Sequence, residues 1–335
     1  MLQCPNCRKY QNLTQQYDLK NKLSIGAFSK VYKITEKSND KENYAVKILK
    51  MDLFKDKSEL IEMQLRNMLK ISHRNIVSYI KIVEDNYQER YLFVVMELAT
   101  GGTLFQQLLK DKTFTEKSVV NIVSQVLEAC EYLHNHEIIH TDLKPQNLLF
   151  KNESANSPIL VSGFGFATIR DQVDDNASRN AYRNILFASP EIALRKPYNN
   201  RVDIWSLGVI TYAVLSGDLP FSCDDDGILI HMIENKDVQF ISNRWKSISE
   251  NAKRFVSTLL IKDPSERPNA AEALNHAWIV ENETVPLPVR GILKRSVTSF
   301  TKQTKSNVDK ISHRYKFLSH DSKLMSIEEV EEEEC

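Results

Sequence analysis

The sequence predicts an α+β fold with two lobes, a small antiparallel sheet followed by a larger helical part. Short segments of alternating apolar residues fill most of residues 17–97, apart from one helical stretch. The pair Gly101 and Gly102 then interrupts the chain, and the apolar residues that follow recur with helical spacing. Because each lobe buries its own apolar face, we expect a cleft between the two.

Five strands and one helix are expected in the first lobe. The strands are predicted at residues 17–25, 28–36, 42–49, 76–83 and 89–97. Apolar residues at positions 61, 65 and 68 predict a helix over residues 58–72. In the second lobe an apolar stripe predicts a helix over residues 117–136, and an almost wholly apolar run predicts a buried helix over residues 202–215.

Composition restricts the class of protein. The chain has 335 residues, 42% of them apolar, which is enough for a large core. Lys plus Arg and Asp plus Glu both number 44, so no global field favours nucleic acid or a membrane surface as a partner. No apolar run reaches the length of a membrane span, and residues 1–10 lack the apolar core of a signal peptide. We therefore expect a cytoplasmic protein, with the nucleus as the alternative.

The cysteines do not predict a disulfide framework. There are five of them, scattered at positions 4, 7, 130, 223 and 335. Cys4 and Cys7 have the spacing of a zinc knuckle, but no second pair follows that would complete four ligands. The favoured interpretation is a disordered tail over residues 1–16, and a zinc-linked adaptor is the weaker alternative.

The most informative stretch is residues 138–149, which read IIHTDLKPQNLL. Apolar pairs lead into and out of a polar loop whose turn is fixed by a proline, so the polar side chains stand on a rigid frame. A carboxylate, an ammonium group and a carboxamide at this spacing suit phosphoryl transfer. Asp142 would orient a hydroxyl and take its proton, Lys144 would neutralise the phosphoryl group, and Asn147 would hold a divalent metal. A polar loop without chemistry is the alternative.

The whole run resembles the catalytic loop of protein kinases, HRDLKPxN, with the lysine that is typical of the serine/threonine branch. The later runs PYNNRVDIWSLGVITYAVLSGDLPF and DPSERPNAAEALNHAWI are similar to the calcium/calmodulin-dependent kinase group. The resemblance implies a two-lobed kinase domain over residues 17–279. Its N-lobe would span residues 17–97 and its C-lobe residues 98–279, with a C-terminal tail over residues 280–335.

The resemblance also implies an ATP site between the lobes. The run YAVKIL resembles the kinase VAIK strand, so Lys47 would hold the α- and β-phosphates. The run LSIGAFSKV resembles the glycine-rich loop but keeps one of its three glycines, and YLFVVMEL is similar to the strand that enters the hinge. The implied nucleotide-binding residues are Ile25, Gly26, Val31, Ala45, Lys47, Met96, Glu97, Leu98 and Leu149.

Two departures remove acidic groups that the family uses together. The run HRNIV resembles a kinase turn, HPNIV, and this register places Gln64 where the family has the glutamate that pairs with Lys47. The Gln64 amide could still hydrogen-bond the lysine. Gly163 stands where the family has its metal-binding aspartate, which leaves Asn147 as the one usual metal ligand. We therefore expect ATP as the cofactor, with magnesium binding weak or absent.

Other family positions imply structure rather than chemistry. Met68, Tyr79, His140 and Phe164 match residues that stack between the lobes of active kinases, and Asp203 belongs to the same set. Glu191 and Arg267 match a buried ion pair of the large lobe. By contrast, Thr141 replaces the arginine that clamps a phosphorylated activation segment, and Gln146 replaces an acidic residue that often recognises arginine in substrates.

The C-terminal tail has an uneven charge pattern. Residues 290–323 hold nine Lys or Arg against two Asp, with apolar residues among them, and the chain ends in six Glu within ten residues. Such a segment after a kinase domain can be an autoinhibitory or calmodulin-binding helix. A disordered tail whose acidic end screens its basic part is the alternative.

Two functional interpretations follow. The favoured one is a nucleotide-binding pseudokinase of calcium/calmodulin-kinase type that acts in signalling by binding protein partners. The alternative is a slow serine/threonine kinase that transfers the γ-phosphate of ATP to hydroxyl groups of a protein substrate. Asp142 and Lys47 support the alternative, whereas Gln64 and Gly163 oppose it, because efficient transfer needs both missing acids.

Overall fold

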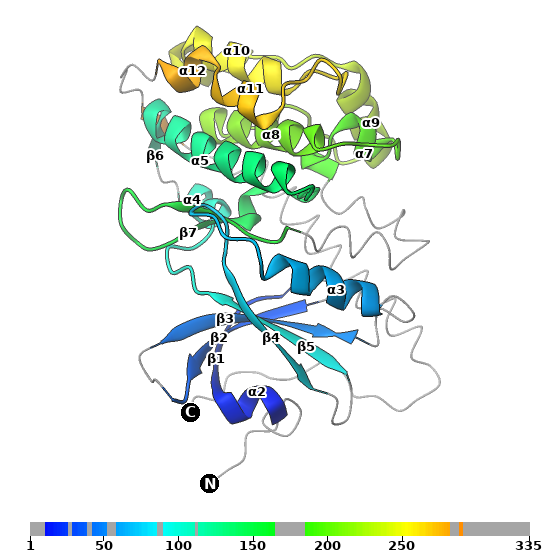
Figure 1. Ribbon diagram of the computed structural model, residues 1–335. Coiled ribbons are helices and arrows are strands. Elements are labelled where there is room, and N and C mark those ends of the chain that lie inside the picture. Colours follow the sequence, from blue (N-terminus) through cyan, green and yellow to red (C-terminus); the bar gives the residue numbers. More distant parts are fainter. Residues whose placement is uncertain are drawn as a thin grey trace.

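The computed structural model describes residues 11–25, 29–38, 42–51, 58–85, 90–110, 113–164, 185–281 and 288–290. A strand-rich lobe lies at one end of the molecule and a helical lobe at the other (Figure 1). The predicted α+β architecture with two lobes is therefore confirmed. None of the helices in these ranges is long and apolar enough to cross a membrane.

The first lobe contains one antiparallel sheet with the strand order β1-β2-β3-β5-β4. Its strands are β1 (Tyr17–Ile25), β2 (Ser29–Glu36), β3 (Asn43–Lys50), β4 (Tyr79–Asp85) and β5 (Tyr91–Glu97). All five predicted strands are present, but β4 begins later than expected. Ile76 forms a bridge with Val161 of the second lobe instead, and Val77 N–H donates to the Val161 carbonyl. This segment therefore joins the lobes.

Two helices pack against opposite faces of the sheet. Helix α3 (Ser58–Met68) lies between the sheet and the helical lobe, and it ends earlier than the predicted residue 72. Helix α2 (Gln11–Gln16) lies on the far side, where Leu13 is fully buried (Figure 1). The structure thus differs from the predicted tail over residues 1–16, because one apolar side chain fixes the second part of that segment. Cys4 and Cys7 lie outside the described residues.

The second lobe is built around two long helices, α5 (Glu116–Asn135) and α8 (Arg201–Ser216). Every residue of α8 from Val202 to Ser216 is buried, as its apolar sequence predicts. Shorter helices surround them: α4 (Leu104–Leu109), α7 (Pro190–Ala193), α9 (Asp226–Asn235), α10 (Glu250–Leu259), α11 (Ala270–Leu274) and α12 (Ala277–Val280). Two 3-10 turns, η2 (Pro145–Asn147) and η5 (Asn243–Ser247), complete the helical part.

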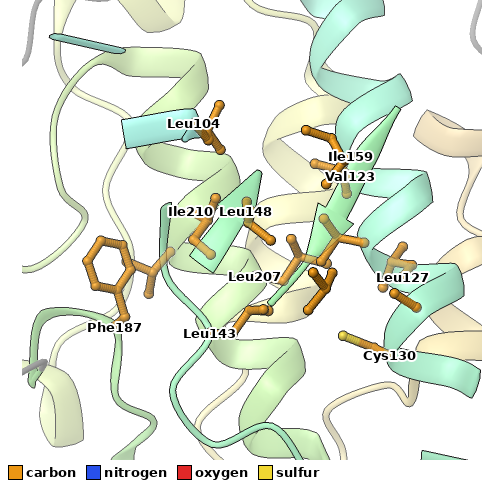
Figure 2. Packing of buried hydrophobic residues seen from close by; sticks show 14 of the residues in the cluster. Leu104, Val123, Leu127, Cys130, Leu143, Leu148, Ile159, Phe187, Leu207 and Ile210 are labelled. Atoms are coloured by element: carbon orange, nitrogen blue, oxygen red, sulfur yellow. The ribbon is translucent and has the colours of Figure 1, made fainter. Parts of the chain in front are cut away.

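The core of the second lobe includes residues on both sides of the polar part of the run at 138–149. Figure 2 shows apolar side chains that meet there from five parts of the chain. They come from α4, α5, α8, the loop that follows α5, and a hairpin of β7 (Leu148–Phe150) and β8 (Ile159–Val161). Leu143 and Leu148 flank the polar part of the run at 138–149, so the polar side chains between them are anchored in this core at both ends.

A short strand connects the C-terminal segment to the large lobe. Strand β9 (Pro288–Arg290) pairs antiparallel with β6 (Thr113–Thr115), which directly precedes α5. The predicted tail over residues 280–335 therefore includes a strand at its start. Residues 291–335, which carry most of the basic segment and the acidic end, lie outside the described residues.

Candidate active site

The loop between α5 and β7 is held from below by a buried carboxylate. Asp203, in the first turn of α8, is fully buried and accepts hydrogen bonds from His140 N–H at 2.9 Å and Thr141 N–H at 2.8 Å. His134 Nε2 lies 2.8 Å from the same carboxylate. Three partners satisfy the buried charge, so the backbone of the loop is fixed. Nothing in the sequence pattern had indicated a role for His134, which comes from the last turn of α5.

His140 links this loop to the segment before Gly163. Its Nδ1 accepts from Asp142 N–H at 3.3 Å, so Nε2 carries the proton and donates to the Ser162 carbonyl at 2.9 Å. Ser162 also donates from its N–H at 2.8 Å and its hydroxyl at 3.0 Å to the Asn147 carbonyl. Sequence analysis missed Ser162, whose contacts depend on pairing between distant segments.

The structure brings the three predicted catalytic residues together. Lys144 Nζ lies 2.8 Å from Asp142 Oδ2, and Asn147 Nδ2 donates to the Asp142 backbone carbonyl at 2.7 Å. Both charged side chains are about one fifth exposed, so they are accessible from the cleft yet positioned by their surroundings. This arrangement can present a carboxylate to a hydroxyl group and an ammonium group to a phosphoryl group.

The side chain of Asn147 lies close against Gly163. Gly163 has a φ of +84°, and a Cβ at this position would lie 3.2 Å from Asn147 Cγ. Because Asn147 Nδ2 is already used, its Oδ1 is the atom with which it could bind a cation. Among the described residues, no group of three or more His, Cys, Asp or Glu could hold a metal ion. A single carboxamide oxygen is a poor donor set for magnesium, so these residues do not fit the usual kinase metal site.

Lys47 lies on β3 opposite Val31 of β2 and Val94 of β5. Burial lowers its pKa to about 7, while Asp142 acts to raise that pKa and Lys144 acts to lower it further. Gln64 does not supply the predicted hydrogen bond through its side-chain oxygen. That atom is buried and has no hydrogen-bond partner in the described part of the chain. The carboxylate that orients this lysine in active kinases is thus absent at position 64, and the Gln64 oxygen does not accept a hydrogen bond from the described residues in its place.

The residues expected around an adenine lie at the end of the sheet that faces the hinge. Ala45 is buried and pairs in register with Met96, while Val31, Met96, Leu98 and Leu149 are half-buried. Leu149 bridges Thr103, where the chain leaves the hinge. These apolar side chains, next to the Lys47 amine, fit a purine with attached phosphates.

Three further residues were predicted to contact the nucleotide: Glu97, Ile25 and Gly26. Glu97 N–H donates to the Ser78 carbonyl at 3.0 Å, so it is already used within the first lobe. Ile25 is 55% exposed at the tip of β1. Gly26 lies outside the described residues.

One contact of the predicted stack between the lobes, that of Tyr79 with Phe164, is confirmed, and the other members are buried. Phe164 is fully buried and stacks on Tyr79 of β4, with ring centroids 5.1 Å apart and planes at 8°. Met68 at the end of α3 is buried, as is His140. The apolar framework of an active kinase is therefore assembled around a cleft that has lost two acids.

The large lobe also contains the predicted ion pair. Arg267 Nη1 and Nη2 lie 2.7 and 3.1 Å from the two carboxylate oxygens of Glu191, and both residues are buried. Arg267 donates further hydrogen bonds to the carbonyls of Ile261, Arg201 and Lys262. The guanidinium group is thus satisfied along all its edges.

The two lobes, the lysine on β3 and the Asp, Lys and Asn of the loop before β7 together define a protein of the kinase class. Consistent with this, the chain belongs to the protein kinase domain family, whose model matches residues 17–279. The described departures, Gly163 and Gln64, lie within the matched region.

The chain is similar to two kinds of kinase, serine/threonine-protein kinase H1 and calcium/calmodulin-dependent protein kinase type 1. Mouse serine/threonine-protein kinase H1 is 36% identical over 268 residues, which cover 80% of this chain and 62% of that protein. The human protein of the same name gives the same identity and coverage. Calcium/calmodulin-dependent protein kinase type 1 of Caenorhabditis elegans is 35% identical over 280 residues, covering 83% of this chain and 78% of the relative. The chain thus spans less than two thirds of the H1 relatives.

Proposed function

We propose that this protein is a pseudokinase of calcium/calmodulin-kinase type, which binds ATP without strong magnesium binding and acts in signalling by binding protein partners. The observation that carries the proposal is Gly163 beside Asn147, because glycine supplies no ligand at the position where the family places a metal-binding carboxylate. Metal charge stabilisation contributes several kcal/mol to phosphoryl transfer, and each ~1.4 kcal/mol changes the rate tenfold. Losing it would lower turnover by orders of magnitude.

The chain's own residues support nucleotide binding better than transfer. Ala45, Met96 and Leu149 would cover the purine, and the protonated amine of Lys47 would attract the phosphates. ATP supplies a transferable γ-phosphoryl group when bound. Asp142 remains placed to accept a proton from a hydroxyl group, but Lys47 has no carboxylate at position 64 to aim it.

The second candidate is a slow serine/threonine kinase with a protein substrate. It is favoured by the contact of 2.8 Å between Lys144 and Asp142 and by the stack of Tyr79 on Phe164. These features would position a hydroxyl group and keep the lobes in an active arrangement. The names of the relatives, which are serine/threonine-protein kinase H1 and calcium/calmodulin-dependent protein kinase type 1, also favour it.

Transfer of radiolabelled phosphate by the pure protein decides between the two candidates. The reaction is run with magnesium and with EDTA, and Asp142→Asn serves as the matched control because it keeps the shape of the side chain but removes the base. A pseudokinase should give no incorporation above that control in either buffer. Incorporation that Asp142→Asn abolishes would instead establish a kinase.

We also propose calmodulin as a partner of the basic segment at residues 290–320. Support comes from its charge pattern and from relatives named as calcium/calmodulin-dependent kinases. A synthetic peptide of this segment should bind calmodulin with calcium and lose binding in EDTA. A peptide with its Lys and Arg replaced by Gln is the matched control. Equal binding of both peptides, or no binding of either, would contradict the proposal.

A further inference from the structure

The sheet of the first lobe separates two helices that have no direct sequence connection. Along β5, Leu92 and Val94 belong to the apolar cluster of α3, whereas Tyr91, Phe93 and Val95 belong to the cluster that buries Leu13 of α2. Alternating residues of one strand thus belong to the two apolar clusters that include the two helices. A displacement of one helix can therefore affect the other only by moving the strands that lie between them.

The last two residues of β4 hold the beginning of α2. Asn12 N–H donates to Asp85 Oδ2 at 2.9 Å, and Asn12 Nδ2 donates to the Glu84 carbonyl at 2.7 Å. Asp85 is buried, so its carboxylate serves as a fixed acceptor for a helix N-terminus. Further along β4, Lys81 Nζ lies 3.0 Å from Gln16 Oε1 at the other end of α2.

The same end of β4 also holds α3. Arg66 Nη2 lies 2.7 Å from Glu84 Oε1 and 2.7 Å from Glu62 Oε1 within α3. The second oxygen of Glu62 lies 2.7 Å from Arg90, the residue before β5. Two acids and two guanidinium groups thus tie α3 to the β4–β5 hairpin. Glu84 takes part in both attachments, through its carbonyl toward α2 and its carboxylate toward α3.

In active kinases, an ion pair between the lysine on β3 and a Glu positions this helix. In this chain, the ion pairs of Glu62 and Arg66 join α3 to the β4–β5 hairpin. Gln64 has no hydrogen bond through its side-chain oxygen, yet Met68, one turn further along α3, is buried in the core beneath the sheet. The buried side chains of Ile61, Leu65 and Met68 hold one face of the helix against the core. On its other side, Arg66 pairs with Glu84 and Glu62 pairs with Arg90.

We propose that α2 positions α3 through the end of β4, so that the segment preceding the kinase domain controls the placement of Gln64 and Met68 in the cleft. Loosening α2 would release the Glu84 backbone, and the Glu84 carboxylate would then hold Arg66 less well. The inference does not depend on whether the protein transfers phosphate, because it concerns the position of a helix.

Hydrogen exchange of the full-length protein tests this coupling. Leu13→Ala removes the anchor of α2 and should raise exchange of α3 amides about tenfold, while amides of α10 in the other lobe stay unchanged. Asn12→Ala is a milder variant, which loses the side-chain bond to Glu84 without opening a core cavity. The matched control is Gln15→Ala, since Gln15 is exposed on the same helix.

The outcomes separate a coupling from a local effect. Faster exchange in α3 for Leu13→Ala and Asn12→Ala, but not for Gln15→Ala, supports the proposal. Faster exchange confined to α2 overturns it. If Leu13→Ala does not fold, Asn12→Ala combined with Arg66→Ala gives the decision. Coupled helices require exchange in the double variant to differ from the product of the two single effects, and independent helices require the two to be equal.

Discussion

The buried arginine of the large lobe and the lysine of the cleft are both cations, but their surroundings differ. Arg267 meets a carboxylate and three carbonyls, so every donor group is used. Lys47 has a neutral residue, Gln64, at the position where active kinases have its carboxylate partner, and burial lowers the pKa of its amine to about 7. The chain therefore keeps the buried ion pair of the large lobe. The cleft keeps Lys47, Asp142 and Lys144 but has neutral residues at positions 64 and 163.

This contrast indicates which constraint the sequence still satisfies. A buried guanidinium group without its partner would destabilise the whole lobe. Gln64 and Gly163 are neutral, so neither leaves a carboxylate buried without a counter-charge. The stack of Tyr79 on Phe164 is, like the Arg267–Glu191 pair, a contact that stabilises the fold, and it is present. A protein that must fold and bind, but need not transfer phosphate quickly, would show this division.

The largest expected effect comes from breaking the structural pair. Arg267→Ala leaves Glu191 buried without a counter-charge, which should cost about 3–5 kcal/mol of unfolding free energy and lower Tm by about 10 °C or more. Thermal unfolding measures this change. Arg74→Ala, which removes an ion pair with Glu128 from a side chain that is 73% exposed, is the control and should leave Tm almost unchanged. Equal effects of the two substitutions would show that Arg267 is not a structural centre.

The second prediction concerns two variants that add carboxylates to the cleft, as Glu191 supplies one to Arg267. Gly163→Asp would place a carboxylate beside Asn147, and Gln64→Glu would give Lys47 a counter-charge. We expect partial activity from the first, less from the second, and about 10²-fold more phosphotransfer than wild type from both together. If the two groups act as one unit, the double variant exceeds the product of the single effects.

The control for this repair addresses the backbone. Residue 163 has a positive φ, which costs any side chain some free energy, although Asp tolerates it better than most residues. Gly163→Ala also places a side chain at this positive φ but brings no metal ligand, so it should gain no activity. A wild-type rate already near ~1 per second at saturating ATP and magnesium would show that the two acids were never needed.

Sequence patterns predicted the parts of the fold that repeat regularly. The helices α5 and α8 begin and end within one residue of their predicted limits, since each has a continuous apolar stripe. The start of β4 was misplaced, because Ile76 and Val77 are apolar and extended but pair with β8 of the other lobe. Helix α2 was missed because it has one buried apolar residue, Leu13, and no periodicity.

The candidate site was predicted in identity but not in its connections. Asp142, Lys144 and Asn147 lie within six residues of one another, so a local motif was enough to bring them together. Arg66 pairs with Glu84 of β4 and Glu62 pairs with Arg90, the residue before β5, and no spacing rule relates these residues. That the Gln64 oxygen has no partner depends on side-chain packing, which a sequence pattern does not contain.

The third prediction uses the lowered pKa of Lys47. In the free protein its amine loses its proton as the pH rises through about 7, although its ordinary pKa is 10.5. Binding phosphates requires the protonated form, so ATP affinity should fall by up to about tenfold per pH unit above 7. Titration with a fluorescent ATP analogue between pH 6 and 8.5 measures this. Lys47→Arg keeps its charge throughout and should flatten the profile, whereas equally flat profiles would refute the role of Lys47.

The smallest expected effect is the difference that magnesium makes to nucleotide binding. Asn147 offers one neutral oxygen and Gly163 offers none, so the cleft gains little by binding ATP as its metal complex. ATP at a hundred times its Kd stabilises the folded protein by ~2.7 kcal/mol, which raises Tm by several degrees. Thermal unfolding should give similar shifts with ATP in EDTA and with ATP in magnesium. Gly163→Asp supplies the comparison, because its added carboxylate should enlarge the shift in magnesium alone. A wild-type Tm shift that appears only with magnesium would mean that other groups complete the metal site. The absence of acids at positions 64 and 163, in contrast to the paired Arg267, would then no longer explain the function.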